Sequence, residues 1–363
     1  MANMLPDDIL LFQILPRLPA RSIGRSMCVC KQWHSFLTTP VFTKMHLHHV
    51  NNQNHHKLLV VSTTNPCKYF QTIDCETPEL GLSAIRSLPF EANSKEMLVI
   101  SSLNGLVCVS IDSLLHGSLR YSDIILWNPL TGDYKMLSKD NSNGKNFRIA
   151  AKGYGLYYSS CDDDHRLLRV TQSGDAYIYS LKSDSWRKVE STICCLLKYW
   201  NLSCVLNEKL YFLAQGRNKM NVWSYLIIRF DTKTETFTEI AAPCLEYIGT
   251  SCLKLKVVSE CIHLCVSSKG IKSWDKLEVW KMDGDGEWTK TVSYCDKLCK
   301  HVFSRPLYLM KNGNWLVGSK GKGYVYKVDL EMKTAKEVCA YTDGEMDILW
   351  GGKFVETFVS LKR

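Results

Sequence analysis

The sequence predicts a mainly β protein with a small helical domain at its N-terminus, because two contrasting patterns follow one another. Over residues 1–47, apolar residues recur at helical spacing between prolines. After Pro66, short runs of β-forming residues alternate with turn signals almost to the end. The chain has 363 residues, more than one average domain. We expect domains over residues 1–47 and 58–363, joined by a polar linker over residues 48–57.

The first helix is predicted from its start and stop signals. Pro6 suits the first position of a helix, where a missing N–H has no consequence. Asp7 and Asp8 follow in the first turn, where carboxylates face the positive end of the helix dipole. Apolar pairs four residues apart continue the helix until Pro16 and Pro19 end it.

A second helical pattern starts at Ala20 and ends at Pro40. Its apolar residues fall on one face of a helix. They are Ile23, Met27, Cys30, Trp33 and Leu37. Three short helices in about forty residues bury little surface. We therefore expect the apolar side chains to form both an internal core and a surface on which a partner docks.

The region after Pro66 contains an internal repeat. Five segments share one layout, in which a strand with a large apolar residue is followed by a polar turn and a second strand. These large residues are 52, 51, 50 and 48 positions apart. They are Trp127, Tyr179, Phe230, Trp280 and Val328. A period near 50 built from hairpins is typical of a kelch-like β-propeller, in which each repeat is one four-stranded blade.

Residues 58–363 hold about six such periods, so we expect about six blades, the first of them poorly marked. Residues 354–361 read as a strand that pairs with the first blade and closes the ring. The alternative is a pair of β-sandwiches with accidental spacing. The tryptophans of the repeats are expected to pack between blades rather than to stack on a ligand. They are Trp127, Trp186, Trp280 and Trp288.

Composition excludes several classes of protein. The formal charge of +9 is spread over the chain without a run of five basic residues, so we expect no nucleic-acid partner. No apolar run approaches the ~18 residues of a membrane span, and the N-terminus lacks the pattern of a signal peptide. We expect a cytoplasmic or nuclear protein whose 16 cysteines are reduced.

No catalytic motif is present. The sequence lacks a Gly-rich phosphate loop, a Gly-x-Ser-x-Gly elbow and a His-Glu-x-x-His pair. Weak metal patterns occur, but each lacks a full ligand set. They are residues 46–57, Cys261-x-His263-x-Cys265, Cys295-x-x-x-Cys299-x-His301 and Asp162-Asp163-Asp164. We expect no metal, no cofactor and no enzymatic activity.

The helical segment resembles an F-box. The matching residues, in order, are Leu5-Pro6, Ile9, Ile14-Leu15, Leu18-Pro19, Ser22-Ile23, Arg25, Cys30-Lys31-x-Trp33, Leu37, Pro40-x-Phe42 and His46-Leu47. Ile23 stands where Leu is commoner, and Thr39 stands where an acidic or small residue often precedes the proline. Neither change removes an apolar docking group.

The β region resembles the F-box-associated domain found behind many plant F-boxes. Six short pieces match in the family's order: residues 104–108, 127–131, 153–155, 179–186, 230–237 and 279–288. There are two departures. Leu156-Tyr157-Tyr158 replaces an aromatic-acidic continuation, and Asn207 stands where Gly is common, which is a mild change because Asn tolerates a positive φ.

These resemblances imply a substrate-recognition subunit of an SCF-type ubiquitin ligase. The F-box would bind a Skp-type adaptor and, through it, a cullin scaffold, while the propeller would bind a protein target. The resemblance implies that the adaptor contacts Leu5, Pro6, Ile9, Ile14, Leu15, Leu18, Pro19, Ser22, Arg25, Cys30, Lys31 and Trp33.

Target binding is expected in the loops of the propeller, the usual place for variable recognition. The candidate connectors are residues 139–146, 159–166, 215–221, 267–276 and 318–323. Three of them combine basic residues with an aromatic residue, which suits an acidic or phosphorylated protein surface. The candidate residues are Arg217, Lys219, Trp223, Lys269, Lys272, Trp274, Lys320, Lys322 and Tyr324. Two alternatives stay open: an F-box scaffold outside a ligase, and a propeller that binds a ligand or catalyses a reaction.

Overall fold

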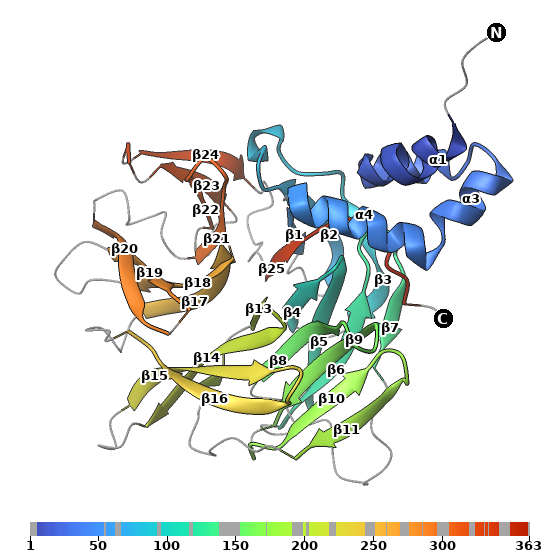
Figure 1. Cartoon of the computed structure of the whole chain (residues 1–363). Helices are drawn as coiled ribbons and strands as arrows, with labels where there is room; N and C mark the ends of the chain where they lie inside the picture. Colours follow the sequence, from blue (N-terminus) through green and yellow to red (C-terminus); the bar gives the residue numbers. More distant parts are fainter. Residues whose placement is uncertain are drawn as a thin grey trace.

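A computed structural model shows a helical domain beside a ring of β-sheets (Figure 1). It describes residues 6–53, 56–61, 67–92, 96–115, 119–137, 153–171, 173–190, 199–200, 203–217, 223–243, 251–258, 260–268, 276–284, 286–295, 305–318, 324–329, 331–332, 334–340 and 349–361. Within these residues the strands form six sheets, five of four strands and one of five. The predicted architecture, a small helical domain and a six-bladed propeller, is confirmed.

The helical domain begins with one helical segment whose pitch changes along its length. The segment comprises α1 (Asp7–Ile9), the π-helical turn η1 (Leu10–Ile14) and the 3-10 turn η2 (Leu15–Arg17). Three further helices follow: α2 (Ala20–Ser26), α3 (Lys31–Leu37) and α4 (Pro40–Gln53). The pitch changes where Pro16 lacks the N–H of a regular helix, and Pro19 separates η2 from α2.

The second helical pattern is interrupted, contrary to prediction. Residues 27–30 form a turn, and the Cys30 Sγ atom caps α3 by accepting a hydrogen bond from the Trp33 N–H at 3.4 Å. Cys30 is therefore exposed and does not belong to the apolar face. Part of the expected linker is also helical, since α4 runs to Gln53 before β1 begins at Lys57. The domain boundaries remain a prediction.

Each blade runs from an inner strand at the channel to an outer strand. Blade 1 is β25 (Leu349–Phe354), β1 (Lys57–Val61), β2 (Cys67–Asp74) and β3 (Arg86–Ala92), with the 3-10 turn η3 (Pro78–Leu80) between the last two. Blade 2 is β4 (Glu96–Leu103), β5 (Leu106–Leu115), β6 (Leu119–Trp127) and β7 (Tyr134–Met136). Blade 3 is β8 (Gly153–Ser159), β9 (Asp164–Val170), β10 (Ala176–Ser180) and β11 (Ser185–Val189).

The remaining three blades follow the same order. In blade 4, β12 (Tyr199–Trp200) and β13 (Cys204–Leu206) both pair with β14 (Lys209–Arg217). The strands β15 (Trp223–Asp231) and β16 (Thr236–Ala241) follow. Blade 5 is β17 (Ser251–Val258), β18 (Cys261–Ser268), β19 (Lys276–Met282) and β20 (Trp288–Cys295). Blade 6 is β21 (Arg305–Leu309), β22 (Trp315–Gly318), β23 (Tyr324–Asp329) and β24 (Thr334–Ala340).

The repeat read from the sequence is the hairpin between the third and fourth strands of blades 2 to 6. The large residue of each repeat ends or lies in the third strand, and the residue seven positions later stands opposite it, as in Trp127 with Tyr134 and Tyr179 with Trp186. Blade 5 is the exception: Trp280 stands opposite Lys290, ten positions later, and the register shifts at a bulge between Val279 and Trp280.

The ring is closed by the C-terminal part of the chain, but not by the predicted strand. β25 pairs antiparallel with β1, so the first blade takes its inner strand from residues 349–354. Residues 355–361 form no strand and run on beyond the ring as an extended segment. Their alternating pattern was therefore read correctly as extended but wrongly as a strand of the sheet.

The cores lie between neighbouring blades, as a propeller requires. Trp127 is fully buried, with the rings of Phe70 and Phe90 from blade 1 edge-on to it at 4.7 and 5.6 Å. Trp288 donates a hydrogen bond from Nε1 to the Ala241 oxygen of blade 4 at 2.9 Å. These contacts confirm that the tryptophans pack between blades.

Candidate functional site

The predicted adaptor-binding residues fall into three groups by exposure. Leu15 is buried in the helical core, and Leu5 lies outside the described residues. Four are half-buried: Ile14, Leu18, Ser22 and Trp33. Six are exposed: Pro6, Ile9, Pro19, Arg25, Cys30 and Lys31. The exposed and half-buried residues can offer side-chain atoms to a partner, whereas Leu15 acts through the core.

Three large apolar side chains on the helical domain were missed from the sequence. Phe12, Val29 and Val41 are 47%, 64% and 59% exposed. Phe12 lies edge-on to Phe36, with ring centroids 5.1 Å apart. The apolar pairs predicted to pack inwards in this helix lie four residues apart, and Phe12 belongs to none of them. This position in the sequence indicates that its side chain points outwards. An exposed apolar surface on so small a domain is typical of a protein–protein contact.

The helical core reaches the C-terminal segment of the chain. Leu15, Ile23, Leu37 and Phe42 are buried together, and Phe358 packs against this group. Behind it lies His46 of α4, which is fully buried and donates from Nε2 to the Leu18 oxygen at 3.2 Å. Burial lowers the pKa of His46 to about 4, so the ring is neutral at physiological pH.

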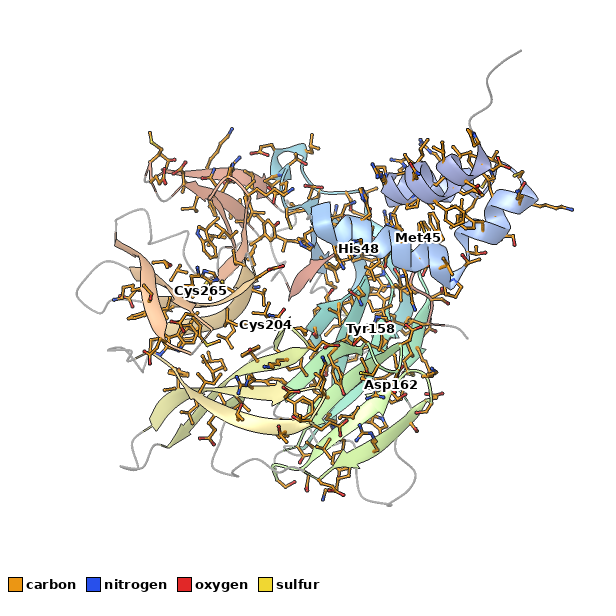
Figure 2. All side chains as sticks on the ribbon, viewed as in Figure 1. Met45, His48, Tyr158, Asp162, Cys204 and Cys265 are labelled. Carbon is orange, nitrogen blue, oxygen red and sulfur yellow. The ribbon has the colours of Figure 1, made fainter. Side chains whose placement is uncertain are left out.

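The helical domain lies against one mouth of the propeller. The turn between β4 and β5, at Asn104, contacts the C-terminal segment, and the turn between β8 and β9 reaches α4, where Lys44 Nζ lies 2.6 Å from Asp163 Oδ2. In Figure 2, Met45 and His48 lie on α4 above the blade that carries Tyr158 and Asp162. The connector 159–166 therefore faces the helical domain, contrary to its prediction as a target loop.

Three of the other predicted connectors are flanked by strands that end at the opposite mouth by topology, whereas residues 139–146 lie outside the described residues. In an antiparallel blade, the turn between the first two strands and the connection between the second and third lie at opposite ends. Residues 215–221, 267–276 and 318–323 each join a second to a third strand. Because neighbouring blades share one direction, as the contact between Ser160 and Glu208 of blades 3 and 4 indicates, the strand ends that flank these connectors face away from α4.

Most of the predicted target-binding side chains lie outside the described part of the chain. Arg217 and Trp223 are placed only by their backbone, as paired ends of β14 and β15. Tyr324 is half-buried, with its ring centroid 6.1 Å from that of Tyr326. The others are Lys219, Lys269, Lys272, Trp274, Lys320 and Lys322, none of which the structure describes. Their part in target binding stays a prediction.

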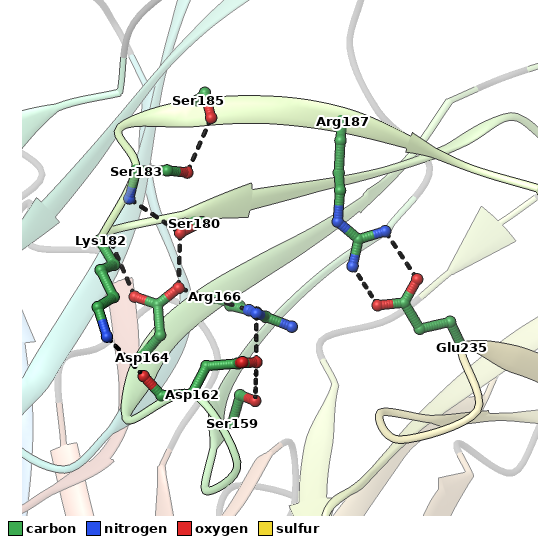
Figure 3. Close-up of polar contacts among 10 residues, drawn as sticks. All are labelled: Ser159, Asp162, Asp164, Arg166, Ser180, Lys182, Ser183, Ser185, Arg187 and Glu235. Atoms are coloured by element: carbon green, nitrogen blue, oxygen red, sulfur yellow. Dashed lines mark hydrogen bonds and ion pairs between the residues drawn. The ribbon is translucent and has the colours of Figure 1, made fainter.

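A polar cavity of about 290 Å³ lies on blade 3, near its border with blade 4 (Figure 3). Asp164 accepts hydrogen bonds from Ser180 Oγ at 2.6 Å and from the Lys182 N–H at 2.9 Å. Arg187 pairs with Glu235 of blade 4, Nη1 lying 2.7 Å from Oε2. The charged groups of the wall are therefore already paired, most of them within blade 3, and the pair of Arg187 with Glu235 joins blades 3 and 4.

The three carboxylates read as a weak calcium pattern are likewise paired. Asp162 accepts from Arg166 Nη2 at 2.5 Å, and Lys44 and Tyr158 both donate to Asp163. These two hydrogen bonds hold the pKa of Asp163 below its usual range. Across the described residues, no three His, Cys, Asp or Glu side chains come close enough to hold a metal ion.

The cysteine patterns differ in how much of them is described. Cys261, His263 and Cys265 lie on β18, where Cys265 is buried and His263 Nδ1 is 3.3 Å from the Cys261 oxygen. Of the second pattern, Cys299 and His301 lie outside the described residues. The absence of a metal remains a prediction. In the part of the chain that is described, no helix has the length and hydropathy to cross a membrane.

Comparison with known protein families identifies the helical domain and the propeller. A model described as F-box associated beta propeller domain matches residues 83–353, well over half of the chain. The chain belongs to this family. A second model, described as F-box-like, matches residues 2–48 of the F-box protein, which span the helical domain up to and including most of α4. Both resemblances read from the sequence are thus confirmed.

This F-box protein is similar along most of its length to proteins of Arabidopsis thaliana. It is 27% identical to "Probable F-box protein At5g47300" over 332 residues, which cover 89% of this chain and 74% of the relative. It is 25% identical to "F-box protein At3g07870" over 85% of this chain and 77% of the relative. It is also 25% identical to "F-box protein ETP2" over 96% of this chain and 89% of the relative.

Proposed function

We propose that this protein is the target-recognition subunit of an SCF-type ubiquitin ligase. Its F-box binds a Skp-type adaptor and, through it, a cullin scaffold, and its propeller binds the protein to be ubiquitinated. The observation that supports this best is an F-box with an exposed apolar face, seated on one mouth of a propeller whose other mouth faces away from it.

The adaptor contact is supported by the exposed apolar groups of the F-box. Pro6, Ile9 and Phe12 lie along its first helical segment, and Val29 and Val41 are exposed at the next two helix junctions. Burying such side chains against a partner contributes about 25 cal/mol per Å² of apolar surface. A domain of this size gains stability from that contact.

Target recognition needs no catalytic group in this chain. F-box proteins are typically non-catalytic adaptors, and a ligase subunit acts by raising the effective concentration of the target near the transferred group. The mouth that faces away from the F-box leaves room for a target while the adaptor is bound. The described strands that lead into the lysine-bearing connectors end at that mouth, which supports the proposal that the connectors take part in recognition.

The adaptor contact is tested with purified proteins. A Pro6→Ala, Ile9→Ala double variant should recover at least tenfold less adaptor in a pull-down than the wild type. Leu80→Ala is the matched control, because Leu80 is 82% exposed on the propeller, distant from the F-box in sequence. Equal adaptor recovery by the double variant and the control would refute the docking face. An adaptor complex that never contains a cullin would favour a scaffold outside a ligase.

A further inference from the structure

We propose that residues 355–361 are a strap that fixes the orientation of the F-box on the propeller. The topology of the ring places this segment beside the F-box. The chain enters the propeller at β1, directly after α4, and leaves it at β25, the strand paired with β1. The C-terminal segment therefore emerges beside the F-box and provides a second attachment next to the covalent one (Figure 1).

The strap has two faces, because its backbone is extended and successive side chains point in opposite directions. Val355, Thr357, Val359 and Leu361 are buried, between 0% and 8% exposed. The residues between them are less buried, and among these Phe358 packs against the F-box core. The buried face thus packs on the propeller, whereas on the other face Phe358 contacts the F-box and Glu356 pairs with Lys57 of β1, with Oε2 2.8 Å from Nζ.

On the propeller side, buried side chains bind the strap through its backbone. Asn128 is fully buried and donates from Nδ2 to the Thr357 oxygen at 3.0 Å and to the Val359 oxygen at 2.8 Å. The Asn128 Oδ1 atom accepts from the Leu130 N–H at 2.9 Å, which orients the amide. Thr357 Oγ1 donates to the Asn104 oxygen at 2.9 Å. These bonds replace the strand ladder that the segment lacks.

Gly105 shows how closely the propeller fits the strap. A Cβ atom at this position would lie 2.1 Å from Thr357 Oγ1, and the backbone has φ +85°, which few residues other than glycine adopt. The turn between β4 and β5 therefore accommodates Thr357 only because residue 105 has no side chain.

On the F-box side, the strap contacts both the core and α4. The Phe358 ring centroid lies 6.0 Å from that of His46, and the ring packs on the group formed by Leu15 and Phe42. Leu47 of α4 packs against the buried group that contains Val359 and Leu361. Strap, α4 and blades 2 and 3 thus share one continuous apolar contact.

The ion pair between α4 and the turn joining β8 and β9 is a weaker contact between F-box and propeller. Lys44 and Asp163 form an ion pair whose side chains are 57% and 54% exposed, and exposed pairs contribute little. The strap therefore adds a buried attachment, through Phe358 and the apolar group around Val359 and Leu361, that this exposed ion pair does not provide. Its use in presenting a target to the ligase rests on the proposed function, but the attachment itself does not.

Hydrogen exchange on the full-length protein tests the strap without adaptor or target. In Phe358→Ala, amides of α4 and of the turn at residues 104–105 should exchange at least tenfold faster, while β14, β18 and β22 of the distant blades keep their protection. Met332→Ala is the control, since Met332 is 73% exposed on blade 6. Unchanged exchange in α4 would overturn the proposal.

A second variant guards against general unfolding. Asn128→Ala removes the two hydrogen bonds to the strap backbone and leaves Phe358 intact. It should raise exchange in the same two regions. Faster exchange in all six blades, without preference for these regions, would also overturn the proposal. A failed adaptor pull-down would leave this result unaffected, so the two proposals are tested separately.

Discussion

His46 is the titratable residue at the centre of the junction between F-box and propeller. Its ring is buried between Phe42 and Phe358, with centroid distances of 6.2 and 6.0 Å, and burial lowers its pKa from 6.5 to about 4. Above pH 6.5 the ring is neutral in both the folded and the unfolded chain. As the pH falls from 6.5 towards 4, only the unfolded chain takes up the proton, so folding stability decreases.

We predict that this histidine contributes a loss of at most about 3 kcal/mol in unfolding free energy between pH 6.5 and 4. His46→Leu should show a shallower pH dependence over the same window. The measurement is urea unfolding at pH 7.5 and 4.5 for both proteins. Identical pH dependences of the unfolding free energy would show that His46 takes up its proton at the same pH in the folded and the unfolded chain, which would contradict the lowered pKa.

At Gly155, neighbouring atoms leave no room for a side chain. A Cβ atom there would lie 2.8 Å from Leu210 Cδ2, and Leu210 is fully buried between blades 3 and 4. Gly155→Ala should lower the unfolding free energy by about 1–3 kcal/mol, the usual range for overpacking a core. Thermal unfolding measures the effect.

Gly24→Ala is the control for the glycine experiment. Gly24 lies inside α2, and a Cβ there would meet nothing within 4 Å. The substitution should therefore stabilise the protein by up to about 1 kcal/mol, because alanine favours the helix. A Gly155→Ala protein as stable as Gly24→Ala would contradict the packing described between blades 3 and 4.

Among the elements, β25 determines whether the ring is closed. Four of the five residues of β1 are buried, and β25 covers the inner edge of that strand. Deleting residues 349–363 should expose this edge and cause self-association, as unpaired strand edges do. Size-exclusion chromatography measures it. Deleting only residues 355–363 keeps β25 and should leave a monomer, and equal behaviour of the two deletions would contradict closure by β25.

The same elements show how far sequence patterns reach. The hairpin repeat was predictable, because each blade must place a large apolar residue such as Trp127 or Phe230 against its neighbour. The strap was not, because alternation in residues 354–361 marks an extended chain and not its hydrogen-bond partner. Here the partner of Thr357 is the side chain of Asn128, which is 229 residues away in the sequence. Cys30 was misplaced because a capping thiol and a buried thiol look alike in sequence.

In the whole molecule, the F-box lies against one mouth of the propeller, and we propose that the other mouth binds a target. The F-box itself was predictable, since its helices need particular apolar residues and prolines in order, but which of its residues contact an adaptor stays a prediction. The target face was not, because exposed loop side chains are not constrained by packing. The mouth that faces away from the F-box is therefore our proposal for recognition, and the fold does not indicate which protein binds there.

The central claim is that one chain binds a ligase and a target through separate faces. The most direct measurement is a mass-spectrometric comparison of the proteins recovered with the wild type and with Pro6→Ala, Ile9→Ala from cells in which the proteasome is blocked. We expect adaptor and cullin to disappear from the proteins recovered with the variant, while other bound proteins persist. Recovery of adaptor and cullin with both forms, or loss of all bound proteins together, would contradict the claim.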